Sequence, residues 1–194
     1  PWVFSGAIKN LDEGILDGDL VQVCSNKGGH LGYGHYSKGT SIAIRMISFD
    51  ETIPDAPFFL EKISQAIAVR RDLNLIEAEG QNICRLIHAE GDGLPGLIVD
   101  YYDRVAVIQT HSLGMHKSLE WIVAGLKETL KDALEGAYNK SAKVLRKNGH
   151  INNTDDWVLG NAPENWDAQE HGNSFAIDLV EGQKTGFFVD QREN

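Results

Sequence analysis

Up to about Phe49, short apolar stretches alternate with polar and glycine-rich turns. Residues 40–49, TSIAIRMISF, show this most clearly: one side carries Ile42, Ile44, Met46 and Ser48, and the other carries Ala43, Arg45 and Ile47. A period of two residues is typical of a strand, because successive side chains point to opposite faces of a sheet. Three further stretches, 3–8, 19–25 and 30–36, also predict strands. Several short strands at this spacing indicate a small barrel or sandwich.

Two other stretches have the apolar spacing of an amphipathic helix. From Phe58 to Leu73 the apolar residues recur every three or four positions, with Asp55 as the predicted N-cap and Pro57 in the first turn. The clearest helical pattern runs over 113–134, and Gly136 is well placed to stop it.

The region between and after these helices is rich in strand signals. Residues 82–90, 96–102 and 104–111 predict three strands, with Asp103-Arg104 as a hairpin connection. Further strands are predicted at 142–146, 157–159 and 174–182; residues 183–186 form a turn, and 187–194 could open a helix. Linkers are expected near 73–81 and 148–156. The overall pattern predicts an α+β protein.

The composition narrows the class of protein. A 194-residue chain with 42% hydrophobic residues is an ordinary globular protein. No apolar run is long enough to cross a membrane. Cys24 and Cys84 both lie in strand-like runs and are expected to be small buried residues in a reducing cytoplasm. The net charge of −10 argues against indiscriminate binding of nucleic acid, so any RNA contact needs a local basic patch.

The sequence lacks the motifs of several kinds of catalytic or binding site. The seven histidines are scattered without the spacing of a zinc site, and no GxSxG elbow accompanies a serine nucleophile. The glycine-rich run 27–34, KGGHLGYG, fits neither phosphate-loop fingerprint and is expected to be a hairpin turn. The acidic run 90–100, EGDGLPGLIVD, fits either a cation site or, more simply, a rigid β-turn.

The run that ends the chain, 181–194 (EGQKTGFFVDQREN), concentrates binding chemistry. After a bend at Thr185-Gly186 it offers two aromatic faces, a carboxylate, an amide and a guanidinium: Phe187, Phe188, Asp190, Gln191 and Arg192. That set suits a ligand with an aromatic base, ribose hydroxyls and a carboxylate. A plain helix start fits equally well. We expect the chain to be part of a longer protein whose chemistry lies beyond Asn194.

Four blocks together resemble a known family. PWVFSGAI, GYGHYSKGTSIAIRMIS, EGDGLPGLIVDYYDR and EGQKTGFFVDQREN are similar, in the same order, to the PUA-domain-containing S-adenosylmethionine-dependent rRNA methyltransferases, which methylate cytosine C5 of large-subunit rRNA. The last two blocks in succession are the most specific.

The resemblance implies an N-terminal PUA-like β-barrel over 1–73 that binds RNA, a central α/β domain over 80–172, and the start of a truncated Rossmann-like methyltransferase domain over 173–194. It places Phe187, Phe188, Asp190, Gln191 and Arg192 near the cofactor, S-adenosylmethionine. It assigns RNA contacts to Tyr33, Tyr36, Ser37, Lys38 and Arg45. The catalytic cysteine of the family matches neither Cys24 nor Cys84, so the fragment is expected to be inactive.

The partner implied is ribosomal RNA in the cytoplasm, with no membrane and with a possible homodimer through the central domain. Two other functions fit the sequence: a non-catalytic RNA-binding module, and a protein-interaction scaffold. The family also has a charged stretch after the long central helix, which here reads KSAKVLRKNGHINNTDD, so no RNA contact is assigned there.

Overall fold

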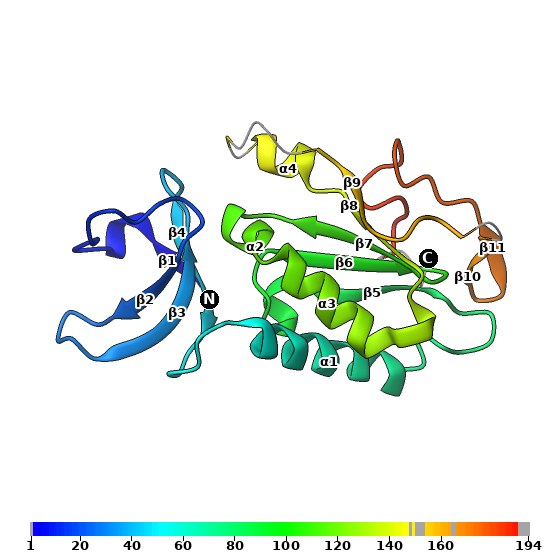
Figure 1. The fold of residues 1–194 in the computed structure, drawn as a ribbon, viewed down its shortest axis with the longest axis horizontal. Coiled ribbons are helices and arrows are strands. Elements are labelled where there is room, and N and C mark those ends of the chain that lie inside the picture. Colours follow the sequence, from blue (N-terminus) through cyan, green and yellow to red (C-terminus); the bar gives the residue numbers. More distant parts are fainter. Residues whose placement is uncertain (1, 148, 150–153, 164–165, 190–194) are drawn as a thin grey trace.

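The computed structural model describes residues 2–147, 149, 154–163 and 166–189. Figure 1 shows two sheets side by side: a small N-terminal sheet and a larger central sheet whose helices cover one face. The predicted α+β fold is confirmed. Within the described residues, no helix is both long and apolar enough to cross a bilayer.

The N-terminal sheet is antiparallel, with its strands in the order β1-β4-β3-β2. Its strands are β1 (Trp2–Phe4), β2 (Leu20–Cys24), β3 (His30–Tyr36) and β4 (Ile42–Ser48). All four correspond to predicted strands. A short 3-10 turn, Ser5–Ala7, follows β1.

Both faces of strand β4 are largely buried, so burial does not alternate from residue to residue along it. Ile44 and Met46 pack with Val21 in the small core of the N-terminal sheet. Ile47, on the opposite face, belongs to the main core of the central part. The N-terminal sheet is therefore packed against the central part through β4.

The central sheet has five strands in the order β5-β6-β7-β8-β9, all antiparallel except the β7–β8 pair. The strands are β5 (Ile83–His88), β6 (Leu97–Tyr102), β7 (Val105–Thr110), β8 (Gly136–Asn139) and β9 (Asp156–Leu159). The predicted hairpin at Asp103-Arg104 is confirmed, and both residues have positive φ, which matches the twist of a tight hairpin. A 3-10 turn, Ala89–Asp92, lies between β5 and β6.

Helices α1 (Ala56–Asp72) and α3 (Leu119–Leu130) lie together on one face of this sheet (Figure 1). Asp55 caps α1 as predicted, because its Oδ1 accepts a hydrogen bond of 3.1 Å from the Phe58 backbone N–H. Phe59, Ile63 and Ile67 of α1 are fully buried in the main core with Ile122 and Leu126 of α3.

The predicted single helix over 113–134 is wrong in its limits. It is divided at Ser118 into α2 (Leu113–Lys117) and α3, and α3 ends at Leu130, where Lys131 takes a positive φ. A 3-10 turn, Lys131–Ala133, follows, and Gly136 begins β8 instead of stopping a helix. The helical spacing of apolar residues continues through these breaks because α2, α3 and the 3-10 turn all face the main core.

The predicted strand at 142–146 is also wrong: these residues form the helix α4 (Ala142–Lys147). Its first turn is held by Asp155, whose Oδ1 accepts a 2.8 Å hydrogen bond from the Ala142 N–H. Periodicity cannot separate strand from helix in so short a run, and the capping carboxylate is far away in the sequence.

Near its end the chain forms a small hairpin of β10 (Ala168–Glu170) and β11 (Asn173–Phe175). The predicted strand over 174–182 therefore survives only in its first two residues, and the helix expected from 187 is absent at 187–189, the part of it that the structure describes. Cys84 is buried as expected, whereas Cys24, at the end of β2, is exposed.

Candidate cofactor-entrance and RNA-binding sites

Residues 176–189, here called the closing segment, lie over the face of the central sheet that α1 and α3 leave uncovered. Along β7, Ala106 and Ile108 face the main core, whereas Val105 and Val107 belong to a second core. Leu179 is buried in this second core, and Ile177, Phe187 and Val189 pack against it. The central strands are therefore buried on both faces.

A buried polar network fastens the closing segment to the sheet. Asp100 of β6 is fully buried, and Arg85 of β5 binds its carboxylate through Nε at 2.8 Å and Nη2 at 3.0 Å. Thr185 donates its hydroxyl hydrogen to Asp100 Oδ2 at 2.6 Å. Since that hydrogen is used, the 2.7 Å contact between Tyr102 and Thr185 is donated by the tyrosine hydroxyl. Burial, followed by the nearby Asp100 charge, raises the pKa of Tyr102, which keeps it a donor.

This network joins the two most specific sequence blocks, since Asp100 ends EGDGLPGLIVD and Thr185 precedes GFF. The sequence analysis placed Thr185 in a bend and Asp100 in the acidic run 90–100, but it did not predict the bond between them. The available signal was a lone carboxylate within the apolar strand LIVDYY, because a buried charge requires partners.

Other bonds fix the path of the closing segment backbone. Asp178 Oδ1 accepts hydrogen bonds from the N–H groups of Val180 (3.0 Å) and Glu181 (2.9 Å), and these hydrogen bonds lower the pKa of Asp178. Lys140, largely buried at the end of β8, donates to the Gly182 carbonyl at 2.7 Å. Burial lowers the pKa of Lys140. Gly186 has a φ of +134°, a conformation that favours glycine.

The structure separates the two predicted cofactor-side phenylalanines. Phe187 packs against Phe175, with 4.8 Å between ring centroids, and belongs to the second core. Phe188 is 43% exposed, and Lys184 Nζ lies 4.5 Å from its ring centroid. Phe188 is thus the more exposed of the two rings, with Lys184 over one part of it. The predicted partners Asp190, Gln191 and Arg192 lie outside the described residues.

The predicted RNA-binding residues fall into two groups. Ser37, Lys38 and Arg45 lie together, with Arg45 Nη1 3.4 Å from Ser37 Oγ. Tyr33 lies in the middle of β3 and packs against His30, and Tyr36, the last residue of β3, packs on the small core. The structure therefore gathers the polar residues of the predicted set but not its two tyrosines.

The gathered residues line a cavity of about 150 Å³ between the N-terminal sheet and α2, here called the junction cavity. His111, Ser112 and Leu113 line it from the central part. Beside it, Lys117 Nζ bonds to the Asp17 carbonyl and to Asp19 Oδ1, both at 2.9 Å. This ion pair is one of the contacts that hold the two sheets together across the junction.

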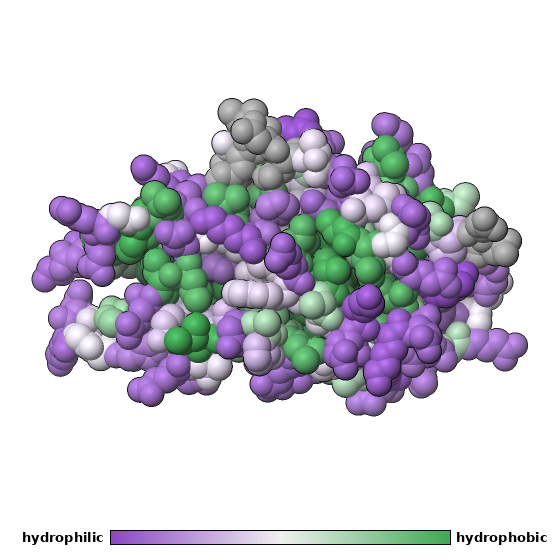
Figure 2. All heavy atoms as spheres, in the orientation of Figure 1, coloured by the Kyte–Doolittle hydropathy of each residue, from purple (hydrophilic) through white to green (hydrophobic). Residues whose placement is uncertain are grey.

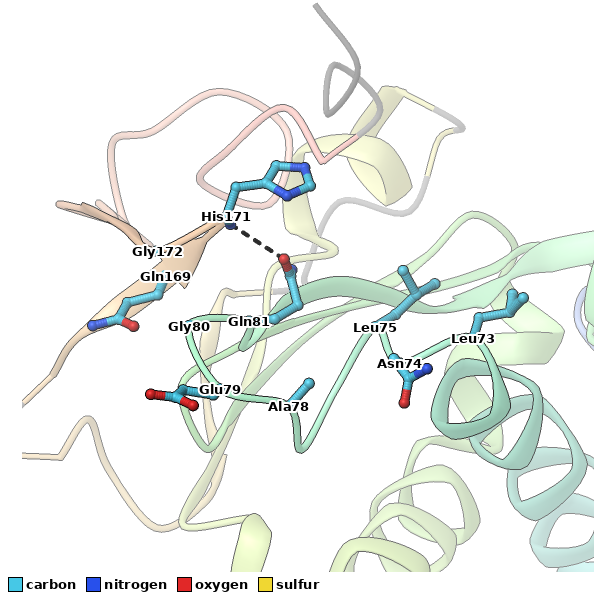
Figure 3. A pocket seen from close by; sticks show the side chains of 10 residues that line it. All are labelled: Leu73, Asn74, Leu75, Ala78, Glu79, Gly80, Gln81, Gln169, His171 and Gly172. Carbon is cyan, nitrogen blue, oxygen red and sulfur yellow. Dashed lines mark hydrogen bonds between the residues drawn. The ribbon is translucent and has the colours of Figure 1, made fainter.

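A larger cavity, of about 650 Å³, lies between residues 73–81 and the β10–β11 turn (Figure 3). Its walls are joined by a 3.2 Å hydrogen bond from the His171 backbone N–H to Gln81 Oε1. None of the predicted site residues lines it. Among the described residues, no group of three or more His, Cys, Asp or Glu side chains could hold a metal ion.

Comparison with known proteins supports the fold and the resemblance. Residues 1–49 match the PUA-like domain family. The whole chain is 36% identical to ribosomal RNA large subunit methyltransferase I of Alteromonas mediterranea and 39% identical to the protein of that name from Shewanella frigidimarina. It covers 48% and 49% of these proteins, so the chain spans about half the length of the curated relatives it matches.

Two solved structures share the fold. One is described as a putative SAM-dependent methyltransferase from Streptococcus mutans; it has a TM-score of 0.79 and 23% identity, with 98% of this chain and 47% of that chain covered. The other is described as a putative methyltransferase complexed with SAH, with the same TM-score and coverage and 24% identity. The chain thus begins with a PUA-like domain, and along its whole length it is similar to proteins named ribosomal RNA large subunit methyltransferase I.

Proposed function

We propose that this chain is the RNA-holding part of an S-adenosylmethionine-dependent rRNA methyltransferase that methylates cytosine C5 of large-subunit rRNA in the cytoplasm. Identity of 36% to 39% over the full chain supports the rRNA methyltransferase assignment. The cytosine C5 specificity rests on the sequence resemblance.

The observation that carries the proposal is the docking of the closing segment. The buried Asp100–Thr185 bond joins the two motifs that are most specific to the family. It brings the aromatic run onto the face of the sheet with Phe187 packed inward and Phe188 exposed. This arrangement presents one flat apolar face where the predicted cofactor residues follow.

Among the described residues, Phe188 has a feature that fits the proposed cofactor. The exposed ring of Phe188 suits an adenine face. We propose that Asp190, Gln191 and Arg192 supply the polar contacts. S-adenosylmethionine, when bound, would supply a methyl group on a sulfonium. Cys84 is buried and Cys24 lies on the N-terminal sheet, so neither is proposed as the nucleophile.

The rRNA contact is proposed at the PUA-like sheet. The chain is acidic overall, so binding needs a local cationic site. Lys38 and Arg45 lie together at the junction cavity and provide such a site.

Three measurements test this function. The 194-residue chain is expected to bind large-subunit rRNA helices in a filter assay, with affinity that falls as salt rises. It is expected not to bind S-adenosylmethionine tightly by calorimetry. The full-length gene product should methylate large-subunit rRNA, and mass spectrometry of the digest should place the methyl group on cytosine C5. Salt-independent RNA binding, micromolar cofactor affinity of the 194-residue chain, or a methyl group on another atom would each contradict the corresponding part.

A further inference from the structure

The junction cavity contains a half-buried arginine, Arg45, that forms no ion pair with a carboxylate of the described residues. Four other arginines in the described chain each pair with a carboxylate: Arg70 with Asp92, Arg71 with Glu77, Arg85 with Asp100, and Arg104 with Glu135. For Arg45, no such ion pair is found among the described residues. Within the described part of the chain, its side chain forms one hydrogen bond, the long 3.4 Å contact from Nη1 to Ser37 Oγ. Most of its five N–H donors are therefore available to a ligand in the cavity.

Burial makes this arrangement unfavourable without a ligand. Burial lowers the pKa of Arg45, and the charge of Glu90 offsets this only in part. A guanidinium removed from water is normally compensated by an anion, because the cost of losing hydration is large. An anion bound in the junction cavity would supply that compensation.

The other walls supply hydrogen-bond donors. Ser37 Oγ accepts from Arg45, and Ser112 Oγ accepts from the Met115 N–H at 3.3 Å. Each hydroxyl therefore keeps its own hydrogen for an acceptor in the cavity. Lys38 adds a second cation at the rim, since it is exposed and lines the same space.

One carboxylate also lines the cavity. Asp17 Oδ1 accepts a 3.0 Å hydrogen bond from the Lys38 backbone N–H, which holds the corner formed by Ser37 and Lys38. The lining has two cationic side chains and one carboxylate, so its net charge is positive.

We propose that the junction cavity binds a tetrahedral oxyanion, and that its natural ligand is a single phosphate of the RNA backbone held by Arg45. A guanidinium with hydroxyl donors is the usual recognition chemistry for a phosphate. Because the walls come from both β4 and the start of α2, the bound phosphate fixes the RNA strand across the junction of the two sheets. The identity of the ligand as RNA depends on the proposed function; the oxyanion site itself does not.

The first test compares two variants with the same loss of charge. Arg45→Met is expected to weaken binding of an rRNA helix about tenfold and to reduce the slope of log affinity against log salt by about one. Arg71→Met is the control, because Arg71 lies at the far end of α1 and should leave both values unchanged (Figure 1). If the unaltered chain binds RNA and Arg45→Met binds equally well with the same slope, the RNA phosphate site is refuted while the proposed RNA binding stands.

The second test measures ligand binding by the unaltered chain. Inorganic phosphate is titrated into the unaltered chain while the Nε–H signal of Arg45, assigned by its loss in Arg45→Lys, is followed by NMR. A saturable shift of this signal supports the oxyanion site even if the chain fails to bind RNA, in which case only the RNA ligand and the proposed function fail. No shift with phosphate, together with an unchanged salt slope in Arg45→Met, overturns the inference altogether.

Discussion

His35 shows at the scale of one residue how the two sheets are joined. It is 5% exposed on β3 and lies against Gly114 of α2. Among the described residues, nothing bonds to its buried Nδ1. Burial, with smaller contributions from the charges of Lys117 and Arg45, lowers its pKa from 6.5 to about 4. The ring is therefore neutral at physiological pH.

A pH-dependent loss of stability follows. Between pH 6.5 and 4 the unfolded chain binds a proton at His35 that the folded chain does not, so the free energy of unfolding falls as pH falls. The contribution of this residue amounts to about 3 kcal/mol by pH 4. Urea denaturation at several pH values should show a shallower acid slope for His35→Gln. An acid slope in His35→Gln equal to that of the unaltered chain would contradict the assignment.

The two neighbouring phenylalanines should respond differently to truncation. Phe187→Ala removes a ring from the second core and is expected to cost about 1–2 kcal/mol of unfolding free energy. Phe188→Ala should change stability by less than about 0.5 kcal/mol, because its ring is largely outside the core. In the full-length protein, however, only Phe188→Ala should weaken cofactor binding while stability is kept. Equal thermal shifts for the two variants would show that their roles are not divided in this way.

At the scale of the elements, close packing depends on small residues at the contacts. Gly114 lies where α2 meets β3, and an added Cβ would be 2.5 Å from His35 Cβ. Strands β5, β6 and β7 and helix α1 were predicted because their patterns are local. The break at Ser118 and the helix at 142–147 were missed, because they depend on contacts such as Asp155 with Ala142, which the local pattern does not contain.

Gly114→Ala tests this junction. Alanine normally favours a helix over glycine by about 1 kcal/mol. Here the clash with His35 should outweigh that gain and destabilise the protein by about 1–3 kcal/mol. Gly6→Ala is the matched control, since an added Cβ there has nothing within 4 Å. Thermal unfolding checks both; a stabilised Gly114→Ala would mean that the junction adjusts freely.

At the scale of the whole molecule, the central sheet connects parts that are far apart in the sequence. It carries the N-terminal sheet at one end, two helices on one face and the closing segment on the other (Figure 1). In Figure 2, hydrophilic side chains cover most of the visible face, with apolar ones gathered beside α3 and over the N-terminal sheet. Sequence reasoning identified the closing segment as important but could not find its anchor, because Asp100 and Thr185 are 85 positions apart.

Removing that anchor should loosen the closing segment selectively. Thr185→Val keeps the shape of the side chain but leaves Asp100 and Tyr102 without their hydroxyl partner. The expected cost is about 1–3 kcal/mol. Hydrogen exchange should rise in residues 176–189 more than in α1, whereas Thr185→Ser should stay close to the unaltered chain. Unchanged exchange in 176–189 with Thr185→Val would show that apolar packing alone holds the segment.

The two-sided burial of the central strands has a practical consequence for expression. A shortened protein that stops after the β10–β11 turn would lose Ile177, Leu179 and Phe187, and would leave Val105 and Val107 facing water on an open sheet. Such a bare, flat surface invites self-association. Attempts to produce the first two predicted regions alone should therefore yield inclusion bodies, and solubility should return once the polypeptide extends through Val189.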